Sequence, residues 1–211
     1  SLSNLTLPYH LRIIRKQAFS NCGSLSTINF PNYINTIGQE AFSNCQSLST
    51  INFPFINYLR ALLNIEQKAF YNCSSLSNIL FPRYMETIDV GAFSYCSALE
   101  SINFPLNLYT IRKEAFAHCI NLRELSMGYV DSIETNAFSY CDHLSTIKML
   151  GRVVSIAENT FYRSTLLTTV EYYDSDQPTC PTDLFLECLN LPHVSVLPLY
   201  QYSSFCGKNV S

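Results

Sequence analysis

One pattern of hydrophobic positions recurs along most of the chain. In its clearest form it reads Ala-Phe-x-x-Cys-x-x-Leu-x-x-Ile-x-Phe-Pro, as at residues 41–54. Later copies drift, with Met127 at the second strand position and Ser164 at the Cys position. The spacings between the repeat phenylalanines are 23, 28, 23, 23, 22, 23 and 24 residues. These phenylalanines are Phe19, Phe42, Phe70, Phe93, Phe116, Phe138, Phe161 and Phe185. A fixed period of this length indicates a solenoid of stacked repeats.

The periodicity changes within each unit. The Ala, Phe, Cys and Leu positions fall at i, i+1, i+4 and i+7, which is one face of a short helical or 3₁₀ segment. Ile51 and Phe53 then alternate with polar Thr50 and Asn52, the two-residue period of a half-buried strand. Pro54 closes the strand because proline cannot donate to the ladder.

These periods predict an α/β solenoid. Its units, about eight in number, would form a parallel sheet on one face and short helical or 3₁₀ segments opposite it. No unit can bury its apolar residues alone, so the units must stack on one another. We expect a single domain over residues 1–211, with residues 179–211 as its C-terminal repeat and cap.

The repeat resembles the BspA-like leucine-rich repeats, whose signature is A-F-x-x-C-x-x-L-x-x-I-x-[FIL]-P at about 23 residues. The resemblance extends from about Leu2 to Cys206. Proteins of this family are associated with the surfaces of bacteria and of mucosal protist parasites such as trichomonads. The resemblance therefore implies adhesion to host matrix or to other microbes.

Composition and motifs exclude several function classes. The net charge is −3 and neither half is basic, which argues against a nucleic-acid partner. No run of roughly 20 apolar residues is present, so we expect no membrane insertion within this segment. The chain lacks a phosphate-binding glycine loop, a G-x-S-x-G elbow and paired histidine motifs. We therefore expect no catalytic, cofactor or metal site and no enzyme activity.

The nine cysteines divide into two groups. Seven occupy the inward Cys position of the repeat and are predicted to be buried free thiols. These are Cys22, Cys45, Cys73, Cys96, Cys119, Cys141 and Cys188. Cys180 and Cys206 lie outside the register, near the end of the array. They form either a capping disulfide or two unpaired thiols, and the sequence favours the unpaired thiols.

The outward strand positions are the first candidate ligand surface, because the sheet of a solenoid is a continuous face. The candidate residues are Asn78, Leu80, Asn103, Glu124, Lys148, Glu171 and His193. The alternative is that small polar residues only solvate the sheet. The scarcity of Trp, Tyr and Arg at these positions favours that alternative.

An insertion between the second and third units is the second candidate surface. Five extra residues lie between Pro54 and Ala69. The segment carries the apolar residues Phe55, Tyr58, Leu59 and Leu62. It either meets a partner as an outward loop or packs back onto the solenoid as an extra turn, the interpretation that we favour.

These patterns predict a non-catalytic module that binds a protein or glycan ligand at the cell surface or outside the cell. The alternative is an intracellular structural scaffold, cytoplasmic or cytoskeletal, embedded in a larger assembly or stacked on further repeats. The many cysteines without clear disulfide partners favour this alternative, because reduced thiols suit the cytosol.

Overall fold

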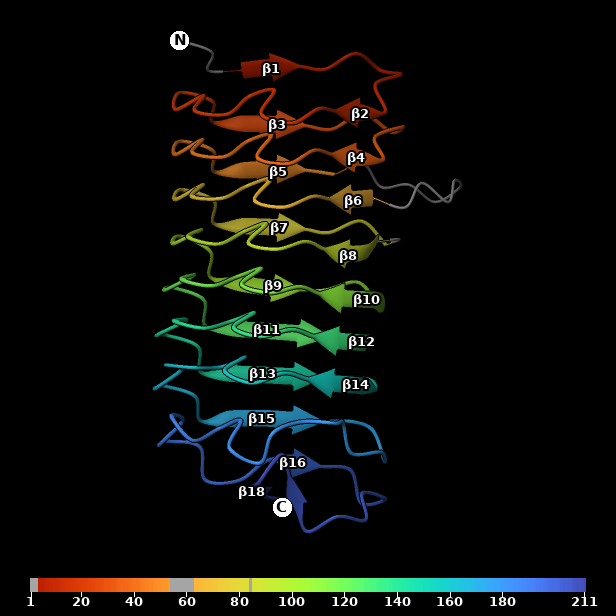
Figure 1. Cartoon of the computed structure of the whole chain (residues 1–211), viewed down its shortest axis with the longest axis vertical. Helices are drawn as coiled ribbons and strands as arrows, with labels where there is room; N and C mark the ends of the chain where they lie inside the picture. The colour runs from red at the N-terminus through yellow and green to blue at the C-terminus, as the bar shows by residue number, and fades with distance from the viewer. Residues whose placement is uncertain (1–3, 54–62, 84) are drawn as a thin grey trace.

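The units stack along a single axis from the N-terminal to the C-terminal end of the protein (Figure 1). This arrangement is seen in a computed structural model that describes residues 4–53, 63–83 and 85–211. The predicted solenoid with a parallel sheet is confirmed. Its long axis is perpendicular to the strands, so each unit contacts only its neighbours.

Nine parallel strands form the sheet that the sequence predicts. In spatial order they are β1 (Asn4–Thr6), β3 (Thr27–Asn29), β5 (Thr50–Asn52), β7 (Asn78–Leu80), β9 (Ser101–Asn103), β11 (Glu124–Met127), β13 (Thr146–Met149), β15 (Thr169–Tyr172) and β16 (Ser195–Val196). Equivalent repeat positions are paired, as in the row of Ile28, Ile51 and Ile79. Every inward strand residue therefore lies directly above its counterpart.

A second parallel sheet of seven strands forms in the return segment, where an isoleucine recurs in register from Ile14 and Ile37 to Ile156. Its strands are β2 (Ile13–Ile14), β4 (Thr36–Ile37), β6 (Leu63–Ile65), β8 (Met85–Ile88), β10 (Asn107–Ile111), β12 (Tyr129–Ile133) and β14 (Val153–Ile156). A short antiparallel hairpin of β17 (Ser204–Phe205) and β18 (Lys208–Asn209) follows at the C-terminus.

The expected helical or 3₁₀ segments are wrong for the part of the chain that the structure describes, where these residues form turns. Each of the first seven units has two residues in the left-handed region, such as Glu40 at φ 55° and Asn44 at φ 60°. A right-handed helix cannot continue through such residues. The apolar residues at i, i+1, i+4 and i+7 therefore lie on the inner side of a turn and not on one face of a helix.

Backbone amides in these turns alternate between two kinds of partner. The Ser43 N–H donates to the Glu40 carbonyl within the turn at 3.1 Å, and the Asn44 N–H donates to Tyr71 in the next unit at 2.8 Å. In the same way, the Phe42 N–H donates to the Ala69 carbonyl at 2.8 Å. The turns thus satisfy their buried amides by bonding to their neighbours.

The core is organised around a column of stacked phenylalanines. Neighbouring ring centroids lie 5.2 Å apart for Phe19 and Phe42, 5.1 Å for Phe70 and Phe93, and 5.9 Å for Phe161 and Phe185. Full burial of each such side chain stabilises the fold by about 1.5–3 kcal/mol. The column thus stabilises every unit through the next one.

The repeat cysteines are free and buried, apart from the partly exposed Cys22, as the sequence predicts. Each thiol beyond the first unit donates to the phenylalanine carbonyl of the preceding unit, as Cys45 Sγ does to Phe19 at 3.2 Å. Burial raises the pKa of Cys45 to about 11 and that of Cys119 to about 12. These thiols are packing groups with one weak hydrogen bond.

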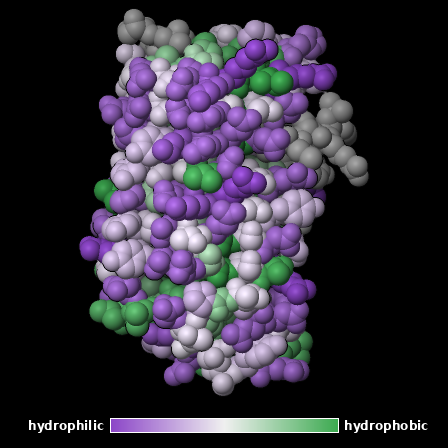
Figure 2. All heavy atoms as spheres, in the orientation of Figure 1, coloured by the Kyte–Doolittle hydropathy of each residue, from purple (hydrophilic) through white to green (hydrophobic). Residues whose placement is uncertain are grey.

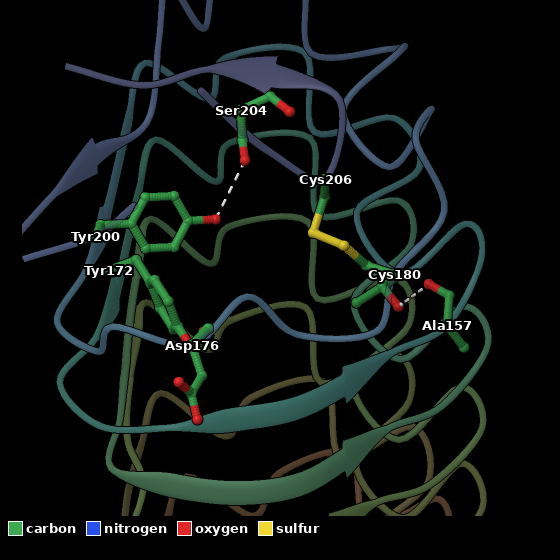
Figure 3. The surroundings of a disulfide bond; sticks show 8 residues. Ala157, Tyr172, Asp176, Cys180, Tyr200, Ser204 and Cys206 are labelled. Atoms are coloured by element: carbon green, nitrogen blue, oxygen red, sulfur yellow. Dashed lines mark hydrogen bonds between the residues drawn. A yellow bond between two sulfur atoms is a disulfide. The ribbon is translucent and has the colours of Figure 1, made fainter. Parts of the chain in front are cut away.

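Cys180 and Cys206 form a disulfide, so the expectation of two unpaired thiols is wrong (Figure 3). The two-residue turn between β17 and β18 holds Cys206 and Gly207 at φ 47° and 82°, which returns the chain towards Cys180. At Gly207 a Cβ atom would lie 1.7 Å from the Thr182 carbonyl oxygen, so only glycine permits this approach.

Aromatic residues close the core at the same end. Phe205 lies between Tyr172 and Phe185, with ring centroids 4.7 and 6.3 Å away. The Tyr172 hydroxyl donates to the Asp176 carbonyl, and the Tyr200 hydroxyl donates to the Ser204 carbonyl at 3.1 Å (Figure 3). Burial raises the pKa of Tyr200 to about 12. This cap covers the last unit of the solenoid.

Replacing Ser164 by cysteine should stabilise the protein. Ser164 occupies the repeat Cys position and is fully buried, and its hydroxyl has no hydrogen-bond partner among the described residues. The longer Cβ–Sγ bond of cysteine lets the thiol reach the carbonyl of the preceding unit. We expect Ser164→Cys to raise the free energy of unfolding by about 1–2 kcal/mol in urea titrations. Cys141→Ser, the matched reverse change, should lower the free energy of unfolding. If Ser164→Cys were less stable than the wild type, the unpaired hydroxyl of Ser164 would not be the cause of a stability loss.

The double variant Cys180→Ser/Cys206→Ser should lose stability because the disulfide closes a loop with a sequence separation of 26. The loss should be about 3.5 kcal/mol in the unfolding free energy from urea titrations under oxidising conditions. Adding a reducing agent should lower the unfolding free energy of the wild type by a similar amount and leave that of the variant unchanged. An equal effect of the reductant on both proteins would show that the cap is not stabilised by this bond.

Candidate functional site

The outer face of the nine-stranded sheet begins with a regular polar ladder. Asn52 Nδ2 donates to Asn29 Oδ1 at 2.7 Å, between residues that are partners in the register of β3 and β5. This amide pair hydrogen-bonds within its own row. The N-terminal half of the face thus matches the simpler interpretation of a solvated sheet.

The row changes character at β7. Leu80 lies beside Asn52 on one strand and Asn103 on the other, and 60% of its surface is exposed. Asn78 and Asn103 are also exposed. An apolar side chain in an otherwise polar row gives this part of the face a contact that the asparagine ladder lacks.

Three charged candidates come together on neighbouring strands. Lys148 Nζ lies 2.7 Å from Glu124 Oε1, and Lys148 is the register partner of Glu171. The Tyr173 hydroxyl donates to Glu171 Oε2 at 3.1 Å. Parallel pairing of β13 and β15 places Lys148 beside Glu171, and the Lys148 side chain reaches Glu124 on β11, which is itself the register partner of Thr146. We call Glu124, Lys148 and Glu171 the charged row.

Electrostatics within the charged row is local. The hydrogen bond that Lys148 Nζ donates to Glu124 is the main cause that raises the pKa of Lys148, and the negative charge of Glu124 adds to it. The hydrogen bond to Glu171 likewise raises the pKa of Tyr173. These groups are solvent-exposed, so their ion pair contributes little to stability. The side chains can exchange their partners for those of a ligand.

The remaining sequence candidates are not joined to this row by pairing. His193 is exposed and lies two residues before β16. The register of β16 with β15 begins at Ser195, whose partner is Glu171. Phe55, Tyr58, Leu59 and Leu62 lie outside the described residues. The face seen in Figure 2 is mostly hydrophilic, and its hydrophobic residues gather more densely over the lower half, where the C-terminal units lie.

An aromatic strip runs along the turns, and the strand pattern in the sequence did not predict it. The ring of His118 stacks between Tyr95 and Tyr140, with centroid distances of 4.3 and 4.5 Å. Tyr71 and Tyr162 extend the strip at 5.3 and 5.4 Å in T-shaped contacts. Aligning the residue before each repeat Cys would have found it. That position holds Asn in the first three units and Tyr, His and Tyr in the next three.

An open hollow of about 500 Å³ lies over the end of the seven-stranded sheet. Ile133, Ile156 and Pro181 line it, and the nearby Glu134 carboxylate accepts the backbone N–H of Lys113 at 2.9 Å. Within the described residues, no three His, Cys, Asp or Glu side chains are placed to hold a metal ion. The described ranges also contain no helix long and apolar enough to cross a membrane.

Comparisons with known proteins agree with this repeat geometry. Among solved structures, a T. pallidum leucine-rich repeat protein is 28% identical over 78% of each chain, with a TM-score of 0.72. A leucine-rich cell surface protein from Faecalibacterium prausnitzii is 19% identical, with 88% of this chain and 69% of that chain covered and a TM-score of 0.42. Pneumococcal vaccine antigen PcpA is 18% identical, with 90% and 55% covered and a TM-score of 0.46. A search of the curated proteins finds no match.

The family assignment follows from the repeat itself. The model of the BspA type leucine-rich repeat region matches in six copies, over residues 1–123 and 63–192. The matched ranges contain the stacked phenylalanines and the repeat cysteines from Cys22 to Cys188. This chain belongs to the BspA-type leucine-rich repeat family.

Proposed function

We propose that this protein is a non-catalytic binding module that engages a protein or glycan ligand through the outer face of its nine-stranded sheet. The observation that carries the proposal is the charged row, in which Glu124, Lys148 and Glu171 lie on three neighbouring strands. Exposed charges held in a fixed order can select a partner of complementary charge.

The rigidity of the sheet supports a role in recognition. Backbone pairing on both sides fixes β11, β13 and β15, so the charged row is presented at strand spacings of about 4.8 Å. A surface that is already ordered loses little conformational entropy when it binds. The exposed Leu80, farther along the same face, adds an apolar contact.

We place the module at the cell surface or outside the cell. The Cys180–Cys206 disulfide supports this location, because such bonds persist in oxidising compartments. The six buried free thiols do not argue against it, since burial shelters them and raises the pKa of thiols such as Cys45 and Cys119. The observation that favoured an intracellular scaffold is thereby explained by packing, so adhesion is the role that we propose.

Removing the charged row should weaken binding without disturbing the fold. Ligands would be recovered from native extract by affinity capture with the wild-type chain, identified by mass spectrometry and titrated by surface plasmon resonance. We expect Glu124→Ala/Lys148→Ala/Glu171→Ala to weaken the affinity at least about tenfold, because complementary charges are lost.

A double change on the N-terminal half of the same face, Asn29→Ala/Asn52→Ala, is the matched control and should retain the affinity. Raised salt should slow association of the wild type and have less effect on the triple variant. Full binding by the triple variant would refute this site. Capture of only intracellular assembly proteins would instead support the scaffold.

A further inference from the structure

The turns of the third to sixth units enclose a trough of about 290 Å³ on an edge of the solenoid distinct from the sheet face. Its floor consists of Ser94, Ala117 and Ser139. One wall is the aromatic strip at Tyr95, His118 and Tyr140, and the other carries Lys68, Glu114 and Asn136. We call this feature the turn trough.

The turn trough is bounded along the solenoid axis. The floor position directly follows the repeat Phe and holds Tyr71 in the third unit and Tyr162 in the seventh. Between them it holds only small residues. Gly91 has no side chain in the polar wall, and the Lys68 side chain lies beside it. A Cβ atom added at Gly91 would lie 3.3 Å from Lys68 Cγ. Small residues in three units, with tyrosines before and after them, make a hollow of limited length.

The aromatic wall presents polar atoms to solvent. The rings of Tyr95, His118 and Tyr140 stack within 10° of parallel, so their faces cover one another and their edges remain free. Tyr95 and Tyr140 are 41% and 38% exposed. Ring edges carry positive potential, and phenol and imidazole groups both donate and accept hydrogen bonds. This wall therefore suits a ligand that is rich in oxygen atoms.

The backbone conformation does not favour the two tyrosines of this wall. Tyr95 and Tyr140 have φ of 63° and 57°, a region that Asn and His tolerate better than tyrosine. The first three units have asparagine at this position in the same conformation. Strained conformations of this kind cluster at functional sites. The backbone conformation at Tyr95 and Tyr140 therefore costs more free energy than it would with asparagine.

We propose that the turn trough binds a short neutral oligosaccharide. Sugar hydroxyls donate and accept hydrogen bonds, and the trough offers both kinds of group through Asn136 and the tyrosine hydroxyls, with Glu114 as an acceptor. The hydroxyls of Ser94 and Ser139 already donate to the carbonyls of Ala117 and Asn136, so the floor serines can only accept. Its volume is close to the lower end of the range for small-ligand sites. The polar wall carries one basic and one acidic side chain, Lys68 and Glu114, which suits a ligand without net charge.

The test uses residues that the same turn already accommodates. Tyr95→Asn/His118→Asn/Tyr140→Asn, in the full chain, gives the fourth to sixth units the asparagine of the first three. Cellohexaose, chitohexaose, maltohexaose and mannohexaose would be titrated by calorimetry and saturation-transfer NMR. We expect at least one to bind the wild type, and to bind the variant at least about tenfold more weakly. A urea titration of the variant verifies that it folds.

The control is Asn29→Ala/Asn52→Ala, which changes neither the turn trough nor the charged row and should bind the sugar like the wild type. The two proposals are tested with different variants, so the failure of one does not affect the result of the other. Absence of binding by all four hexasaccharides overturns the proposal, as does equal binding by the asparagine variant. A protein ligand that only the asparagine variant loses would also overturn it, by making the trough a protein site.

Discussion

Parallel stacking with equivalent residues in register is the constraint on which the rest of the structure depends. In the first six units the phenylalanine N–H bonds to the alanine-position carbonyl of the next unit, and each repeat thiol from Cys45 onward bonds back to the preceding unit. A unit can satisfy these groups only when its neighbour is aligned with it. The phenylalanine column and both sheets follow from that alignment.

Register also determines what the surfaces present. A substitution at one repeat position appears in a vertical row beside its counterparts, so neighbouring units build a feature together. Lys148 and Glu171 are stacked in this way on the sheet, with Glu124 beside them at the neighbouring strand position, and Tyr95, His118 and Tyr140 are stacked on the turns. The inner positions hardly vary because a change there disturbs three units, whereas the outer positions are free to acquire specificity.

The two ends of the solenoid show why the cap matters. Stacking leaves the last unit without a following neighbour, and its apolar side chains need another cover. Tyr172, Phe205 and the Cys180–Cys206 disulfide provide it. At the first unit, Phe19 and Cys22 remain only partly buried. Burial of a repeat position thus depends on having a neighbour on each side.

The sequence by itself determined the period, the inward residues, the strand register and the outward rows. A repeat of fixed length aligns equivalent positions, so the proximity of Lys148 to Glu171 could be predicted from strand positions. The identity of the Cys180 partner, the second sheet, the replacement of helices by turns and the turn trough were decided only by the tertiary structure. Left-handed residues such as Glu40 and Asn44 leave the apolar spacing unchanged, yet they direct alternate amides to the next unit. Bonds between units are non-local, and the periodicity of a single unit does not encode them.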